Sequence, residues 1–154
     1  MKVSTGLRNY ILATDDVAAG LNGGVIKLYG STVSEADAQT LIPATADAAI
    51  GSAVLLCTIS NDGAGTGINL DTTPSNGVIG KASGEVWRGE MVASGYFSFA
   101  RFCTDGDTHE ESTDEKRLQL TVGVLGKEII VSTAYKAIGD EQRIDQFYLG
   151  MPAE

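Results

Sequence analysis

The stretch Glu85–Cys103, EVWRGEMVASGYFSFARFC, holds the single tryptophan and three of the four phenylalanines of the chain. Its residue pattern predicts two antiparallel strands joined by a tight turn at Ser94-Gly95. In such a hairpin Trp87, Met91 and Phe102 share one side, which we expect to face the core. The stretch therefore predicts a packed scaffold and not a reactive centre.

The other side of this hairpin carries two arginines opposite each other, Arg88 and Arg101. Like charges on facing strands repel, so this side requires a nearby carboxylate. Glu90 or an acid from a neighbouring segment or subunit would supply it.

The rest of the chain beyond Gly24 has the two-residue period of strands, interrupted by turns that contain glycine. About eight short strands at this spacing predict an all-β fold, an antiparallel β-sandwich or a jelly-roll-like barrel. We expect one domain over residues 1–154. The expected strands are 25–30, 52–60, 67–70, 78–81, the two of the hairpin, 117–124, 127–133 and 143–149.

Residues 1–23 predict one short helical segment, because Ser4 can cap it and apolar residues follow at three- and four-residue spacing. Acids oppose the dipole at a helix C-terminus, so Asp15 and Asp16 favour a break near Thr14, after which the chain restarts a helix or turns. We place the end of the segment between Thr14 and Leu21. Residues 31–50 predict an extended connector, in which Ser34 can start a short helix that ends by Pro43.

Composition and charge exclude several classes of protein. The 154 residues are 43% hydrophobic and 20% charged, with a formal net charge of −9. Nucleic-acid binding requires clustered Lys and Arg, which this chain lacks, so we expect no nucleic-acid partner. No apolar run approaches the roughly 18–20 residues of a membrane span, and no signal-peptide core is present. We expect a soluble protein made in the cytoplasm, with no membrane contact.

Two cysteines, Cys57 and Cys103, lie in apolar strand-like runs without metal-ligand spacing. Buried free thiols are the expected state. A disulfide between them stays open, because the sequence does not give the distance between their Cα atoms.

The most polar segment is Thr104–Glu115, TDGDTHEESTDE, which includes His109. It fails the EF-hand pattern, since Glu110 stands where that loop needs a glycine and Lys116 where it needs a glutamate. A calcium loop of another kind remains an alternative to a solvated loop. His109 has no catalytic partner set, and we expect it to be exposed. The sequence therefore predicts no enzyme, no metal and no cofactor.

The chain contains the blocks MKVSTGLRNYILAT, GGVIKLYGS, DAAIGSAVLLCTIS, NGVIGKASGEVWRGEMVASG and RLQLTVG. Together these blocks resemble a family of short tailed-bacteriophage virion structural proteins. The resemblance covers most of the chain and implies an all-β protein with no catalytic residues. This chain departs from the family in its more acidic Thr104–Glu115 loop and its longer Ser31–Ile42 connector.

This resemblance implies a structural role in the virion, assembled in the bacterial host cytoplasm. The first hypothesis is a capsid decoration or cement protein that binds the major capsid protein on the outside of the head, in many copies or as a homo-oligomer. One alternative is a tail, baseplate or fibre-attachment component. A further alternative, a carbohydrate-binding module, would need several exposed aromatic residues on one face.

Assembly contacts are expected from Met1–Tyr10 and Ser31–Ile50, because their apolar residues have no evident core position. The arginine side of the hairpin, Arg88 and Arg101, is the other candidate surface. The apolar candidates are Val3, Val33, Leu41 and Ile42.

Overall fold

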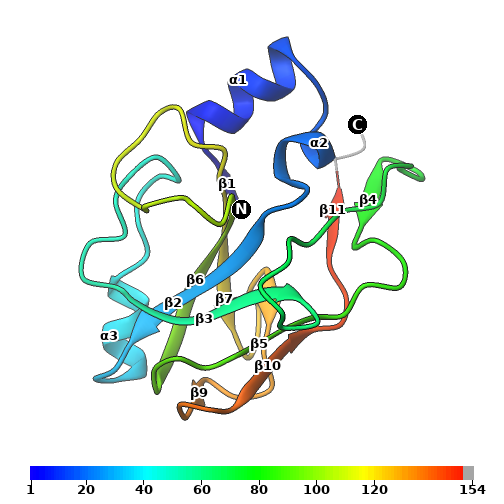
Figure 1. Cartoon of the computed structure of the whole chain (residues 1–154). Coiled ribbons are helices and arrows are strands. Elements are labelled where there is room, and N and C mark those ends of the chain that lie inside the picture. Colours follow the sequence, from blue (N-terminus) through cyan, green and yellow to red (C-terminus); the bar gives the residue numbers. More distant parts are fainter. Residues whose placement is uncertain (151–154) are drawn as a thin grey trace.

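The computed structural model describes residues 1–150, which form a mostly β structure with three helices (Figure 1). Residues 151–154, the last four of the predicted domain, lie outside the described residues. The helices are α1 (Thr5–Ala13), α2 (Val17–Leu21) and α3 (Glu35–Thr40). The strands are β1 (Lys2–Val3), β2 (Val25–Ser31), β3 (Val54–Asn61), β4 (Val78–Gly80), β5 (Trp87–Glu90), β6 (Gly95–Cys103), β7 (Leu118–Gly123), β8 (Ile129–Ile130), β9 (Tyr135–Lys136), β10 (Glu141–Ile144) and β11 (Tyr148–Gly150).

Nine of these strands form one hydrogen-bonded sheet in the order β1-β7-β6-β2-β3-β5-β10, in which β8 also pairs with β7 and β9 with β6. All of these pairs are antiparallel except β7–β8. Strands β4 and β11 form a separate two-stranded sheet. The prediction of a predominantly β fold is confirmed.

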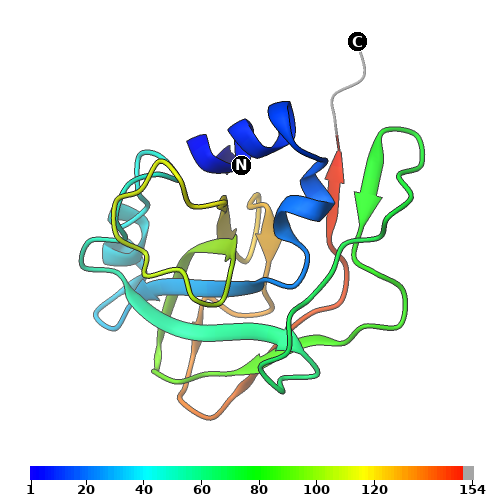
Figure 2. The same cartoon turned by 45° about the horizontal axis from the view of Figure 1, so that its top comes forward.

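The central strands β2 and β6 are buried on both faces. On one face Ile26 and Leu28 of β2 lie in the large apolar core with Phe102 of β6. On the other face Tyr29 and Phe99 stack, with ring centroids 5.1 Å apart, in a second and smaller cluster. Successive residues of a strand point to opposite faces, so double burial requires a cover on each side. The second face is covered by the connector and by the acidic loop, which lie side by side in both views (Figure 2).

The N-terminal helix begins at the predicted cap, since the Ser4 hydroxyl accepts the backbone N–H of Leu7 at 3.1 Å. It ends at Ala13, and a second helix starts at Val17 with Asp16 as its N-cap. The acids that are unfavourable at the end of one helix are favourable at the start of the next. The helix therefore breaks near Thr14 and restarts, as one of the two predicted outcomes has it, and the single short helix of the predicted fold is two.

The connector is not extended throughout, because residues 35–40 form α3, capped by Ser34 as predicted. Strand β6 carries one extra residue, Ser98, at the register shift between Tyr29 and Gly30 of β2. The Ser98 hydroxyl donates to the carbonyl of Ala38 at 2.5 Å and thereby holds α3 against the sheet.

The predicted hairpin within Glu85–Cys103 is wrong. Strand β5 pairs with β3 and β10, whereas β6 pairs with β2, β7 and β9. The predicted core side is nevertheless confirmed, since Trp87, Met91 and Phe102 are all buried. The rings of Trp87 and Phe102 meet across the core, with centroids 6.0 Å apart, instead of lying on neighbouring strands. A shared apolar side is compatible with a hairpin and also with two separate strands that face each other across the core.

The predicted pairing of Arg88 with Arg101 is also wrong, because the two lie on strands that do not pair. Arg88 lies opposite Arg143 of β10, and its guanidinium contacts the carboxylates of Asp62 at 2.8 Å and Glu141 at 2.7 Å. The carboxylates that Arg88 requires therefore come from neighbouring segments of the chain. Arg101 is fully buried on β6, where its guanidinium contacts the connector.

We expect Trp87→Ala to lower the free energy of unfolding by about 3–5 kcal/mol, because the indole fills the centre of the core between Phe102 and Phe147. Chemical denaturation measures the change. Val92→Ala, at a solvent-exposed position in the turn that follows β5, is the control and should change stability little. A Trp87→Ala variant as stable as this control would contradict the packing described here.

Candidate functional site

The second face of the sheet carries a transverse row of polar side chains on four neighbouring strands. Lys27 of β2, Arg101 of β6, Gln119 of β7 and Lys2 of β1 are register partners in turn. Arg101 and Gln119 are fully buried, and Lys27 is nearly so. The Arg101 guanidinium donates to Gln119 Oε1 from Nε at 3.2 Å and from Nη2 at 3.1 Å. Charged side chains thus occupy sheet positions that normally hold apolar residues.

These side chains hold the connector through its backbone carbonyls. Lys2 and Gln119 both donate to the carbonyl of Pro43, at 2.8 and 2.9 Å, and Arg101 donates to that of Ala48 at 2.6 Å. Buried backbone carbonyls outside regular structure need such partners. The polar row therefore supplies donors that the irregular connector cannot obtain from a strand.

Beside this row lies a buried ion pair between Asp107 of the acidic loop and Arg117. Arg117 Nε and Nη2 bind the two carboxylate oxygens at 2.6 Å each, and both side chains are shielded from solvent. Arg117 Nη1 also faces the carbonyls of Ala46 and Asp47 at 3.4 Å. Paired hydrogen bonds of this kind fix the position of both groups. The ion pair joins the acidic loop, the connector and the start of β7.

His109 is buried, so the prediction that it is exposed is wrong. Its ring packs edge-on against Tyr29, with centroids 5.4 Å apart, and its Nε2 lies 3.0 Å from the Lys27 ammonium. An ammonium only donates, so Nε2 accepts and the ring proton lies on Nδ1. The loop reaches inward at this point because the backbone N–H of His109 donates to Asp107 at 2.7 Å. The solvated part of the acidic loop is limited to its remaining residues.

Burial and the nearby cations keep the His109 ring neutral. Burial first, and then the charges of Lys27, Arg101 and Arg117, lower its pKa to about 4 against the opposing effect of Asp107. For the Asp107 carboxyl, burial alone would raise the pKa. Hydrogen bonds from Arg117 and from the His109 backbone outweigh that effect and hold the pKa of Asp107 below its usual value.

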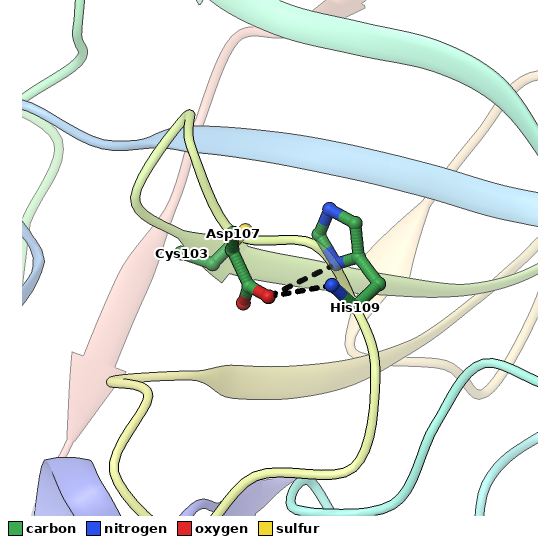
Figure 3. A group of neighbouring side chains, drawn as sticks. All are labelled: Cys103, Asp107 and His109. Carbon is green, nitrogen blue, oxygen red and sulfur yellow. Dashed lines mark hydrogen bonds and ion pairs between the residues drawn. The ribbon is translucent and has the colours of Figure 1, made fainter.

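Cys103, Asp107 and His109 form a compact group of possible metal ligands, with ligand atoms within 4.8 Å of one another (Figure 3). The surroundings do not suit a cation, because Arg117 already binds both oxygens of Asp107 and Lys27 binds the histidine. Burial also raises the pKa of the Cys103 thiol to about 12, which keeps it protonated. The group therefore fits neither a divalent metal nor a thiolate nucleophile.

The N-terminal segment is fastened to the same region. The Ser4 hydroxyl donates to the carbonyl of Glu115 at 2.7 Å and accepts the backbone N–H of Arg117 at 2.9 Å. Gly6 allows the loop to approach, since a Cβ at this position would lie 2.2 Å from the carbonyl oxygen of Asp114. The start of α1 thus packs against the acidic loop.

The expectation that four apolar residues lack a core position is wrong for three of them. Val3 packs against the large core, and Leu41 and Ile42 pack against the cluster of Tyr29 and Phe99. Val33 is exposed, as that expectation requires. Arg88 is partly exposed, whereas Arg101 is buried and has no exposed surface that a partner could contact. Whether any of them contacts a partner stays a prediction.

The buried polar layer was not predicted from the sequence, although the sequence contains part of the pattern that indicates it. Arg101 and Arg117 stand inside or beside apolar runs, FARFC and RLQL, where a charge implies a buried partner. Asp107 and His109 give no such signal in a loop of similar acids. Cys57 and Cys103 are free and buried, which confirms the expected state of both thiols.

Comparisons with protein-family models, curated proteins and solved structures found no match to this chain. No helix within residues 1–150 is long and apolar enough to cross a membrane.

We expect Asp107→Asn to destabilise the protein by about 3–5 kcal/mol, because it leaves the buried Arg117 without its counter-charge. Asp105→Asn, at an exposed position of the same loop, is the matched control and should change little. Urea denaturation of the two variants at pH 7 makes the comparison. Equal stability of the two would show that the ion pair does not hold the loop.

We expect stability to fall as the pH drops from about 6.5 to about 4. In the unfolded chain His109 takes up a proton near its ordinary pKa of 6.5. In the folded protein it stays neutral until the pH reaches its lowered pKa of about 4, so protonation favours the unfolded chain over this range. The loss is on the order of 3 kcal/mol for that difference. Denaturation at several pH values should show a shallower slope in this window for His109→Gln. Identical slopes for the variant and the parent chain would contradict the buried neutral state.

Proposed function

We propose that this chain is a structural protein of a tailed-bacteriophage particle and that it decorates the outer surface of the head. The observation that carries this proposal is that buried ionisable residues hold segments of the chain in place. Arg101, Asp107 and Arg117 are each engaged in holding a loop or strand. A non-enzymatic scaffold accounts for this pattern better than a catalyst does. The resemblance of several sequence blocks to phage virion proteins supports the same class.

The net charge supports a position on the outside of the particle. A chain with a formal charge of −9 is repelled by packaged DNA and gains no affinity from phosphate contacts. Repeated copies on a lattice can bind firmly even when each interface is weak. We propose the major capsid protein as the partner.

One observation favours the alternative, a component of the tail, baseplate or fibre attachment. The sheet ends in β1 and in β10, and neither strand has a second neighbour among the described residues. Exposed strand edges of this kind can pair between subunits in a ring. The number of copies in each particle separates the two positions.

The finer architecture is part of the proposal. We infer that the nine-stranded sheet curls over the large core as a sandwich or a jelly-roll-like barrel. The contact of Trp87 on β5 with Phe102 on β6 supports this, because β3 and β2 separate those strands in the sheet order. A flat sheet would keep the two rings apart.

The test is the ratio of this chain to the major capsid protein in purified particles, measured by quantitative mass spectrometry. Head decoration predicts a ratio within a few-fold of one, and a tail component predicts far fewer copies. Absence of the chain from particles would exclude both positions.

We expect Val33→Asp to reduce the number of copies in particles, because Val33 is an exposed apolar residue of the connector from which assembly contacts are expected. Thermal unfolding should not change, since the side chain is 76% exposed. Leu125→Asp, at an exposed residue between β7 and β8, is the control and should be incorporated normally. Normal incorporation of both variants would move the contact away from Val33.

A further inference from the structure

An apolar groove of about 430 Å³ lies between the N-terminal strand and the small β4–β11 sheet. Strand β1 contributes Val3, β4 contributes Ile79 and β11 contributes Leu149, while Ile11 of α1 and Val17 of α2 complete the lining. Asp16 is the one charged side chain in this lining. Apolar grooves with few polar groups are typical of binding sites.

Two strand edges border this groove. Within residues 1–150, β1 pairs only with β7 and β11 pairs only with β4. In both views β4 lies on the far side of β11 from the N-terminus, so the free edge of β11 faces the groove (Figures 1 and 2). Free edges present backbone donors and acceptors that an added strand can satisfy. The groove therefore suits an extended segment.

Asp16 in the lining and its chain neighbour Asp15 indicate which charge the segment carries. Asp15 and Asp16 are exposed, and each side chain accepts a backbone N–H of its own turn, at 2.9 and 2.8 Å. Neither carboxylate contacts a basic side chain among the described residues. A basic residue beside the bound segment would complement them. A second copy of this chain suits the site poorly, because each copy carries a net charge of −9.

We propose that this groove binds an extended apolar segment of another protein, with a basic residue next to it, and that the segment pairs with β11. The inference rests on the proposed function only for the identity of the partner, a protein of the phage particle. The groove itself is tested without particles.

The probes are two synthetic peptides, KKVTVTV and DDVTVTV, titrated into the isotope-labelled full chain and followed by NMR. The basic peptide should bind at least tenfold more tightly than the acidic one and shift the signals of β1, α1 and β11. Asp16→Asn keeps the helix cap and removes the charge, so it should reduce that preference several-fold. Shifts confined to other elements, or equal affinity for both peptides, would overturn the proposal.

Neighbouring residues of α1 supply a matched pair of variants. Ile11 lines the groove, whereas Leu12 is 86% exposed and does not. Ile11→Asn should weaken KKVTVTV binding about tenfold, and Leu12→Asn should leave it unchanged. Both positions are partly or fully exposed, so both variants should fold. Equal affinities of the two variants would overturn the proposal.

Other occupants give different results. If the chain is a dimer that Ile11→Asn converts to a monomer, the occupant is a second copy and the proposal is wrong. If a chain shortened to end at Gly150 binds the peptide and the full chain does not, the occupant is the chain's own segment 151–154 and the proposal is also wrong. Peptide binding at the groove together with absence from particles would contradict the proposed function alone.

Discussion

The ion pair between Asp107 and Arg117 is the contact on which the arrangement of the second sheet face depends. It joins the acidic loop to the start of β7, and the same guanidinium faces the carbonyls of Ala46 and Asp47 in the connector. Without this ion pair, the acidic loop and the connector would lose the contact that joins them over the buried charges of the sheet. Breaking a buried pair costs far more than the pair contributes, because the remaining charge stays buried. The pair therefore acts mainly by specifying where both segments lie.

The charge of this layer is unbalanced, and backbone carbonyls compensate for the imbalance. Lys27, Arg101 and Arg117 are cations, and Asp107 is the one fully buried carboxylate within residues 1–150. Lys27 and Arg101 donate to the carbonyls of Asp105 and Ala48. Irregular segments have many carbonyls without strand partners, so cations on the sheet and loops over it satisfy each other. The neutral state of His109 belongs to the same balance, since a further positive charge beside Lys27 would be repelled.

These features divide the molecule into a closed side and an open side. On the closed side, the polar groups of the sheet are engaged with loops of the same chain, and this side contributes stability and shape. On the open side, β1 and β11 have free edges within residues 1–150, beside an apolar groove whose lining includes Asp16. The proposed role in assembly requires both properties, a rigid body and a surface that a partner can complete.

The sequence by itself determined the local features of this protein. The caps at Ser4 and Ser34, the change of period at Gly24 and the buried side of Trp87, Met91 and Phe102 all depend on interactions within a few residues or on simple alternation. Only the tertiary structure decided which strands pair. An apolar side looks the same in a hairpin and in two walls of one core, so the pattern could not place β5 beside β3 and β10. The burial of Asp107 and His109 could not be predicted from the sequence either. Their partners, Arg117 and Lys27, are brought to them only by the folded sheet.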